Sequence, residues 1–385
     1  MSARGRTSVT WNANPHTLAK IAILKRYLLA WFQIFGRTRT GQDLLYVDGF
    51  AGPGHYANHN EGSPVAALVA AREVLAASGS AWKAGDIHCA FIEADRATAA
   101  HLNEHLEPFL STPRLHVRIL HDEFARGVSR LKAQRPASFA GRQPLFVFVD
   151  PFGATGVPFS MIRDILGSPA SEVLINFDAD GIERIMRAGM AAKSDPVLTN
   201  VFGDESWRES LSRGTAFRDR CLLAVELYKS RLRALPNVRY VFSFEMLTSR
   251  TRVGQTGYFL IFASQHPRGL GKMKEAMKGM DQAGDYRFSN ARVGQTTMFR
   301  FDRPEDFSPL LLARFAGRRG VPYPNPEILD FALNETPFVN PKSMLKTLEE
   351  QGSIRVASAD PKRRKGTFNE QKRLYIDFLE GHPHG

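Results

Sequence analysis

The chain has 385 residues, 43% of them hydrophobic and 23% charged, which is enough for one large globular domain and a smaller one. Its two cysteines, Cys89 and Cys221, exclude a disulfide framework and a cysteine metal site, and the histidines show no metal-ligand spacing, so no metal is expected. The 51 Lys and Arg residues against 39 Asp and Glu give a formal net charge of +12. This excess favours a polyanionic partner such as nucleic acid, with a solvated basic surface as the alternative.

The first 42 residues form a basic segment that contains no acidic residue. Apolar side chains recur there at spacings of three and four, so residues 16–35 are predicted to form an amphipathic helix. Its basic face either contacts a phosphate backbone or is simply solvated. The basic residues of the segment are Arg4, Arg6, Lys20, Lys25, Arg26, Arg37 and Arg39. The amino terminus lacks the apolar core of a secretion signal, and no apolar run approaches the roughly 18 residues of a membrane span, so we expect a cytoplasmic protein without a membrane partner.

From residue 44 onward, short apolar runs alternate with helical patterns. Strands are predicted at 44–50, 87–95, 115–120, 144–153 and 171–178, and helices at 64–78, 96–109, 123–134 and 158–166. Such alternation predicts an α/β fold with a doubly wound, mostly parallel sheet that is covered on both faces. Residues 180–235 are predicted to be a helical insertion. Runs at 237–247 and 256–265, joined by the basic link 248–255, predict an antiparallel pair at the sheet edge, followed by a helix at 269–280.

A basic unit is predicted to follow the large domain, which we place at residues 43–320. Pro322, Pro324 and Pro326 indicate a hinge. Residues 325–385 then read as helix, helix, strand, basic tip and strand, which is the outline of a winged helix. The four basic residues at the tip, Lys362, Arg363, Arg364 and Lys365, are candidates for phosphate contacts, with a solvated loop as the alternative.

The first motif with chemical content is LLYVDGFAGPGHY, residues 44–56. An apolar strand ends in an aspartate, and small residues after it let the backbone approach a ligand closely. The motif resembles the D-x-F-A-G-x-G motif of amino-group methyltransferases, in which this loop lies against the methionine part of S-adenosylmethionine (SAM). The candidate cofactor-binding residues of the loop are Asp48, Gly49, Phe50, Ala51, Gly52 and Gly54.

Acidic residues also end the next two predicted strands. Glu93 is placed to accept hydrogen bonds from ribose hydroxyls, although Asp95 competes for that role. In the methyltransferase layout, an acid at the position of Asp122 meets the adenine amino group. Acids at three successive strand ends favour a nucleoside site. NAD would suit Glu93 equally well, but the three-glycine dinucleotide fingerprint is absent, which argues against an oxidoreductase.

The sharpest motif is PLFVFVDPFG, in which the most apolar strand ends in Asp150-Pro151-Phe152. It resembles the D-P-P-Y motif of amino methyltransferases, with glycine in place of the last aromatic. The Asp150 carboxylate and the Pro151 carbonyl can accept hydrogen bonds from an exocyclic amine, and Phe152 can stack on its base. These three are the candidate catalytic residues. Asn176 and Asp178, which end the next strand, either line the substrate side or cap the following helix.

Taken together, these stretches resemble the three-Cys-motif partner protein family (TcmP). The similarity extends over nearly the full chain and includes HTLAKIAILKRYLLAW, FIEAD, VFVDPFG and GYFLIFASQHPRGLGKMKEAMKGMD. It implies a bacterial or phage-associated protein with a class I methyltransferase-like, Rossmann-like domain. The implied partner is a Gp37/Gp68-like, radical-SAM-like protein with three cysteines.

We therefore interpret the chain as a SAM-dependent methyltransferase of an exocyclic amino group on a nucleic-acid base, in RNA or DNA, that acts with this partner. The alternative is a non-catalytic scaffold that binds SAM or nucleic acid for the same partner.

Overall fold

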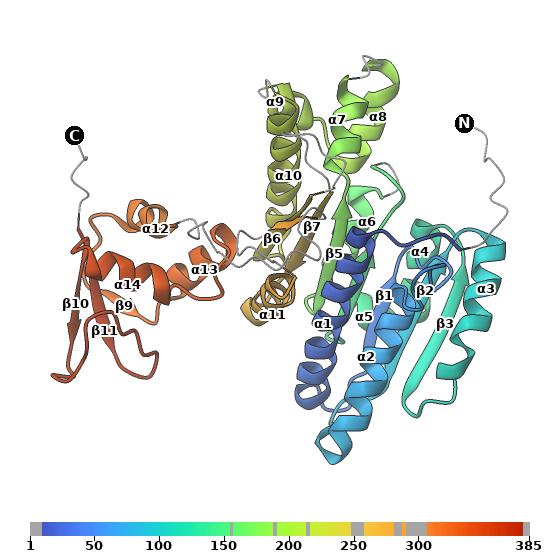
Figure 1. Ribbon diagram of the computed structural model, residues 1–385, viewed down its shortest axis with the longest axis horizontal. Helices are drawn as coiled ribbons and strands as arrows, with labels where there is room; N and C mark the ends of the chain where they lie inside the picture. The colour runs from blue at the N-terminus through green and yellow to red at the C-terminus, as the bar shows by residue number, and fades with distance from the viewer. Residues whose placement is uncertain are drawn as a thin grey trace. The chain divides into compact units, whose positions relative to one another are not determined.

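The computed structural model describes residues 10–154, 157–187, 191–212, 216–247, 258–280, 287–289 and 306–379. Arg4, Arg6 and the basic link 248–255 lie outside the described residues. The chain divides into two compact units, the first holding the elements from α1 to β8 and the second those from α12 to β11 (Figure 1). In the described part of the chain, no helix combines the length and the apolar character of a membrane span.

The first unit is built on one mixed sheet. Its strands are β1 (Leu44–Asp48), β2 (Ile87–Glu93), β3 (Leu115–His121), β4 (Leu145–Val149), β5 (Ser171–Phe177), β6 (Tyr240–Leu247), β7 (Tyr258–Ser264) and β8 (Arg287–Ser289). Their order in space is β3-β2-β1-β4-β5-β7-β6-β8. The first five strands pair in parallel, whereas β7 is antiparallel to both β5 and β6. A parallel sheet with a reversed strand inserted between β5 and β6 is the class I methyltransferase fold, as predicted.

Helices cover both faces of this sheet. They are α1 (Pro15–Thr38), α2 (Ser63–Ser78), α3 (Arg96–Leu106), α4 (Phe124–Gln134), α5 (Pro136–Ala140), α6 (Phe159–Leu166), α7 (Ala179–Arg187), α8 (Ala191–Phe202), α9 (Trp207–Ser212), α10 (Phe217–Arg233) and α11 (Pro267–Lys278). The predicted helical insertion is confirmed as α7 to α10. The predicted antiparallel pair is confirmed as β6 and β7, and the helix after it as α11.

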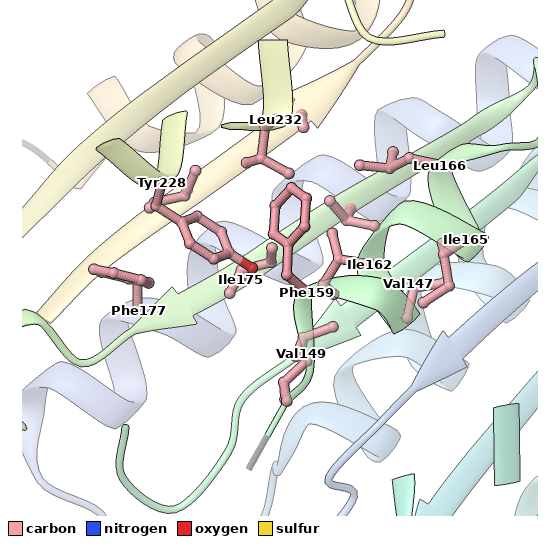
Figure 2. Close-up of a cluster of buried hydrophobic side chains, with 14 of the residues drawn as sticks. Val147, Val149, Phe159, Ile162, Ile165, Leu166, Ile175, Phe177, Tyr228 and Leu232 are labelled. Atoms are coloured by element: carbon pink, nitrogen blue, oxygen red, sulfur yellow. The ribbon is translucent and has the colours of Figure 1, made fainter. Parts of the chain in front are cut away.

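One side of the sheet carries the core that holds the insertion in place. Alternate residues of β4 and β5 point to this side because side chains alternate along a strand. Figure 2 shows part of this core, with Val147 and Val149 of β4, Ile175 and Phe177 of β5, Phe159 and Ile162 of α6, and Tyr228 and Leu232 of α10. All eight side chains are at most 5% exposed. The helical insertion therefore shares a buried core with the sheet of the domain.

The opposite side of the sheet is covered by the amino-terminal helix. The Asn14 side chain accepts a hydrogen bond from the backbone N–H of Thr17, and Pro15 occupies the first turn, so the start of α1 is fixed. The Tyr27 ring lies 5.0 Å from that of Phe146 on β4 and 5.2 Å from that of Phe262 on β7. Helix α1 of the predicted basic segment is thus an integral layer of the domain, beside α2 and α11 (Figure 1).

The second unit has its own core. Its elements are α12 (Ser308–Phe315), β9 (Val321–Tyr323), α13 (Pro326–Glu335), α14 (Lys342–Glu350), β10 (Ile354–Ser358) and β11 (Leu374–Phe378). The strands form an antiparallel sheet in the order β10-β11-β9. Pro322 pairs with Tyr375 within this sheet, and Leu311 and Phe315 of α12 lie in the buried core. The proline-rich stretch is therefore part of the unit, which begins earlier in the chain than residue 325.

Candidate active site

A cavity of about 230 Å³ opens where the parallel strands β1, β4 and β5 reach their carboxyl ends. This edge of a doubly wound sheet is where ligands bind. The cavity brings together the loop after β1, the Asp-Pro-Phe-Gly loop after β4, the end of β5 and the first turns of α1. Its lining includes Trp11, His16, Thr17, Lys20, Phe50, Ala51, Gly52, Gly54, Tyr56, Ser63, Asp150, Pro151, Phe152, Gly153, Asn176, Met246 and Tyr258.

The Asp150 carboxylate is held by two nitrogen donors. The Lys20 ammonium lies 2.8 Å from Oδ1 and 2.7 Å from Oδ2, and the Asn176 amide donates to Oδ1 at 2.6 Å. The Lys20 and Asp150 side chains are 14% and 24% exposed, so this ion pair is only partly open to solvent. Asn176, whose role was left open between lining the site and capping, lies at the site. The carboxylate is thus oriented towards nitrogen donors within the cavity.

The aromatic part of the motif lies at the cavity rim. Phe152 is 75% exposed, which is unusual for so large an apolar side chain. The Trp11 ring approaches it edge-on at 5.9 Å and also meets Tyr56 at 5.9 Å. The three rings form an aromatic cluster in the lining of the cavity that also contains Asp150.

The loop after β1 has the close packing that its small residues suggested. A Cβ on Gly49 would fall 2.6 Å from the Phe124 ring, and Gly52 has a φ of +63°, a conformation that disfavours other residues. The Gly52 N–H donates to the Glu93 carboxylate at 2.9 Å, which joins the loop to the end of β2. Glu93 also accepts from the backbone N–H of Asp95 at 2.8 Å. The structure therefore brings Gly52 and Glu93 together.

Three other acids that the sequence singled out have different partners. Asp95 caps α3 by accepting from the Thr98 N–H at 2.8 Å, which leaves Glu93 as the acid at the β2 end. Asp122 lies 3.3 Å from Arg126 Nε and 3.6 Å from Arg130 on α4. An adenine amino group would share the Asp122 carboxylate with these two arginines. Asp178 accepts from the Gly181 N–H at 2.8 Å and so begins α7, as its capping interpretation predicted.

Asp48 is completely buried beneath the loop. Oδ1 accepts from the Phe50 N–H at 3.2 Å. Burial raises the pKa of Asp48 to about 7, with the Ser63 hydroxyl and the Phe50 N–H opposing the shift and the charges of Asp150 and Glu93 adding to it. Between pH 4 and 7 the folded chain therefore holds a proton here that the unfolded chain has lost.

Because the folded chain holds this proton, its free energy of unfolding should depend on pH. Because the folded-state pKa is raised, the contribution of Asp48 falls as the pH rises from about 4 to 7, by up to about 4 kcal/mol. Asp48→Asn should remove this loss, so the variant should gain stability relative to the wild type between pH 5 and pH 8. Urea unfolding of both proteins at the two pH values measures the difference. An unchanged difference would mean that Asp48 stays ionised in the folded chain.

The basic tip of the second unit divides into two kinds of residue. Lys362, Arg364 and Lys365 are exposed. Arg363 instead forms two 2.7 Å hydrogen bonds to the Glu349 carboxylate, and the two side chains are only 11% and 8% exposed. Arg363 is therefore engaged in the structure of the unit, and three of the four predicted phosphate contacts are accessible.

No protein-family model matches the chain, and no curated protein matches it. Among solved structures, it is similar to an O-methyltransferase from Bacillus cereus in complex with SAH, at 11% identity over 66% of this chain and 82% of that one, with a TM-score of 0.34. It is also similar to the O-methyltransferase TomG from Streptomyces achromogenes in complex with SAM, at 10% identity over 66% and 92%, with a TM-score of 0.31. Because these sequence identities and TM-scores are low, the fold assignment rests on the strand order of the sheet.

Lys20 and Trp11 belong to this site, and sequence reasoning did not identify them as site residues. Lys20 did give a signal, because it lies four residues before the fully buried Leu24 and therefore on the inward stripe of α1. A cation on such a stripe requires a buried acidic partner. Trp11 precedes the helix and gave no comparable signal.

Proposed function

We propose that this chain transfers a methyl group from SAM to an exocyclic amino group of a nucleic-acid base. The observation that carries the proposal is the Asp150 carboxylate, which already accepts hydrogen bonds from an amine-type nitrogen inside the cavity. An acceptor amine in place of the Lys20 ammonium would donate to the same oxygens. The exposed Phe152 ring beside it would stack on the base that carries the amine.

The residues that would hold SAM are the loop after β1 and Glu93. The absence of a Cβ at Gly52 leaves the backbone accessible, and the Glu93 carboxylate next to it has the chemistry that ribose hydroxyls require. SAM supplies an electrophilic methyl group on a sulfonium sulfur. The chain's own contribution is at the acceptor: Asp150 and the Pro151 carbonyl orient the amine and stabilise the positive charge that grows on its nitrogen, before that nitrogen releases a proton.

The test is transfer of labelled methyl groups from SAM to total RNA and total DNA, with and without the three-Cys-motif partner that the sequence resemblance implies. The expected product is a base methylated at an exocyclic nitrogen, identified by mass spectrometry of the nucleosides. Label on neither polymer, together with no SAM binding by calorimetry, would contradict the proposal.

The second unit would supply contacts to the phosphates of the nucleic acid through Lys362, Arg364 and Lys365.

One observation favours the non-catalytic scaffold as a second candidate. Lys20 and Asn176 already occupy the Asp150 carboxylate, so an acceptor has to compete with an ion pair within the chain. A scaffold would keep this pair permanently, whereas an enzyme would open it when the acceptor binds.

Lys20→Met tests whether this ion pair limits access of the acceptor to Asp150. A partly exposed ion pair contributes up to about 1 kcal/mol. Its removal should therefore lower the KM for nucleic acid about fivefold and leave kcat unchanged. Lys25→Met is the matched control, because Lys25 lies on the same helix in a similarly exposed pair with Glu61. A tenfold fall in kcat at constant KM would instead place Lys20 in the catalytic machinery.

A further inference from the structure

A short segment before α1 forms part of the wall of the candidate active site. Residues 10–14, which we name the strap, contribute Trp11 to the lining of the cavity. The Asn58 side chain accepts from the Ala13 N–H at 2.7 Å and donates to the Ala13 carbonyl at 3.0 Å. The Ala57 N–H donates to the Trp11 carbonyl at 2.9 Å. Because one side-chain amide pairs with both backbone groups of Ala13, the strap is fixed to the loop after β1 in both position and direction.

The strap places the Trp11 ring between the two loops of the site. A Cβ on Gly52 would fall 3.8 Å from the Trp11 ring, so the ring lies against the loop after β1. The same ring packs edge-on against Phe152, with the ring centres 5.9 Å apart and the planes at 66°. It meets the Tyr56 ring at 5.9 Å and 77°. Trp11 therefore contacts both the predicted cofactor loop and the Asp-Pro-Phe-Gly loop.

The Phe152 ring has little support from its own loop. Its side chain is 75% exposed, and Gly153 after it has a φ of +89°, a turn that disfavours other residues. A Cβ on Gly153 would meet no atom within 4 Å, so there is open space at the turn. Within the described residues, Trp11 is the aromatic side chain that contacts the Phe152 ring. A neighbouring ring that restricts an exposed side chain beforehand lowers the entropy that the side chain loses when a ligand binds.

We infer that Trp11 is a positioning residue, which holds the Phe152 ring in the orientation in which it stacks on the acceptor base. This role rests on the proposed function, because it requires a base at Phe152. Trp11 acts through Phe152, and Asn58 acts one step further away by holding the strap. Loss of Trp11 or Asn58 should therefore weaken binding of the acceptor and leave the methyl-transfer step unchanged.

The kinetics of a double-mutant cycle test this role. Phe152→Ala should raise the KM for the polymer that accepts label, total RNA or total DNA, about tenfold, because it removes a base–aromatic stack. Trp11→Ala should raise this KM about fivefold, with kcat and SAM affinity within about twofold of the wild type. The double variant should resemble Phe152→Ala, because Trp11 then has no ring to orient. Trp11→Phe keeps a ring against Phe152 and should bring the KM back to within about twofold of the wild type.

Three results of the cycle would overturn the inference. A KM raised about fiftyfold in the double variant would show that the two rings act independently. A wild-type KM in Phe152→Ala would mean that there is no stacking ring to position. A fall in SAM affinity of about tenfold in Trp11→Ala, with an unchanged KM, would assign Trp11 to cofactor binding instead.

The fluorescence of Trp11 tests the strap without the methyl-transfer reaction. The other three tryptophans are at most 8% exposed, namely Trp31, Trp82 and Trp207. Because Trp11 is partly exposed, quenching by acrylamide reports mainly on Trp11. Asn58→Ala removes both hydrogen bonds to Ala13, so it should increase the quenching constant about twofold and raise the KM about as much as Trp11→Ala does.

Asn60→Ala is the matched control, since Asn60 is an exposed residue two positions further along the same loop, and it should match the wild type in quenching and in KM. Unchanged quenching in Asn58→Ala would mean that the strap is held elsewhere. Increased quenching with a wild-type KM would mean that the position of Trp11 does not affect the acceptor. Either result would overturn the inference. If the wild type transfers no label, the proposed function fails and the positioning role fails with it, and the quenching series distinguishes that outcome from a failure of the strap alone.

Discussion

Asp150→Asn should lower the rate of methyl transfer to nucleic acid by about 10²–10³-fold and leave SAM affinity within about twofold of the wild type. The asparagine keeps the shape of the side chain but replaces a carboxylate oxygen with an amide donor. The acceptor amine then loses a charged hydrogen-bond acceptor, and the positive charge that develops on its nitrogen is no longer stabilised. Removal of a single preorganised electrostatic partner costs catalysis on this scale.

The Lys20 ammonium complicates this experiment, because it loses its partner when Asp150 is changed. The double variant Asp150→Asn with Lys20→Met removes the unpaired cation and should remain as inactive as the single variant. Asp164→Asn is the control, since Asp164 is half exposed on α6 and lies 3.7 Å from Lys132. Rates come from label transfer and SAM affinity from calorimetry. Wild-type rates in Asp150→Asn would contradict the catalytic assignment, and a large loss of SAM affinity would show that the effect lies in cofactor binding.

The sequence was sufficient to place the central part of the site. Asp48, Glu93 and Asp150 each end a strongly apolar run, and parallel strands place their carboxyl ends at one edge of the sheet. The position of these residues therefore follows from periodicity alone. The reversed β7 was predictable for a similar reason, because a short link between two β-rich runs favours an antiparallel pair.

The rest of the site depends on packing between distant parts of the chain. Lys20 and Asp150 are separated by 130 positions, and only the way α1 lies across β4 and β7 brings them together. Likewise, Pro322 looks like a hinge residue in the sequence, but it pairs with Tyr375 on a strand that comes more than 50 residues later. Periodicity describes single elements and contains no information about such contacts.

The basic run at 362–365 shows the same limit at the level of single side chains. Four consecutive cations suggest one shared role, but Glu349 on α14 accepts two hydrogen bonds from Arg363 and one from the Gly366 N–H at 2.7 Å. The Arg363 guanidinium also lies 5.2 Å from the centre of the Phe368 ring. Charge runs in a sequence do not show which of their members are turned inward.

Arg363→Ala should therefore destabilise the second unit by about 3 kcal/mol, because removing one partner of a buried ion pair leaves the other charge uncompensated. For a unit of this size, that loss corresponds to a fall in Tm of about 10–20 °C. Calorimetry of the full chain should show a lower Tm for one transition only. Arg364→Ala is the neighbouring control: Arg364 is exposed, so its removal should change the Tm little and instead weaken nucleic-acid binding and reduce its salt dependence.

The difference in Tm between the wild type and Arg363→Ala should also depend on pH. Burial raises the pKa of Glu349, but hydrogen bonds from Arg363 and the Gly366 N–H lower it by more, so the net pKa lies below its usual value. A depressed pKa contributes stability above the unfolded value, near 4.3, and that stability is lost as the pH falls through the folded pKa. This difference in Tm should therefore have its full size at pH 7 and decrease below about pH 4. A gap independent of pH would mean that Arg363 stabilises the unit through its packing on Phe368 rather than through its charge.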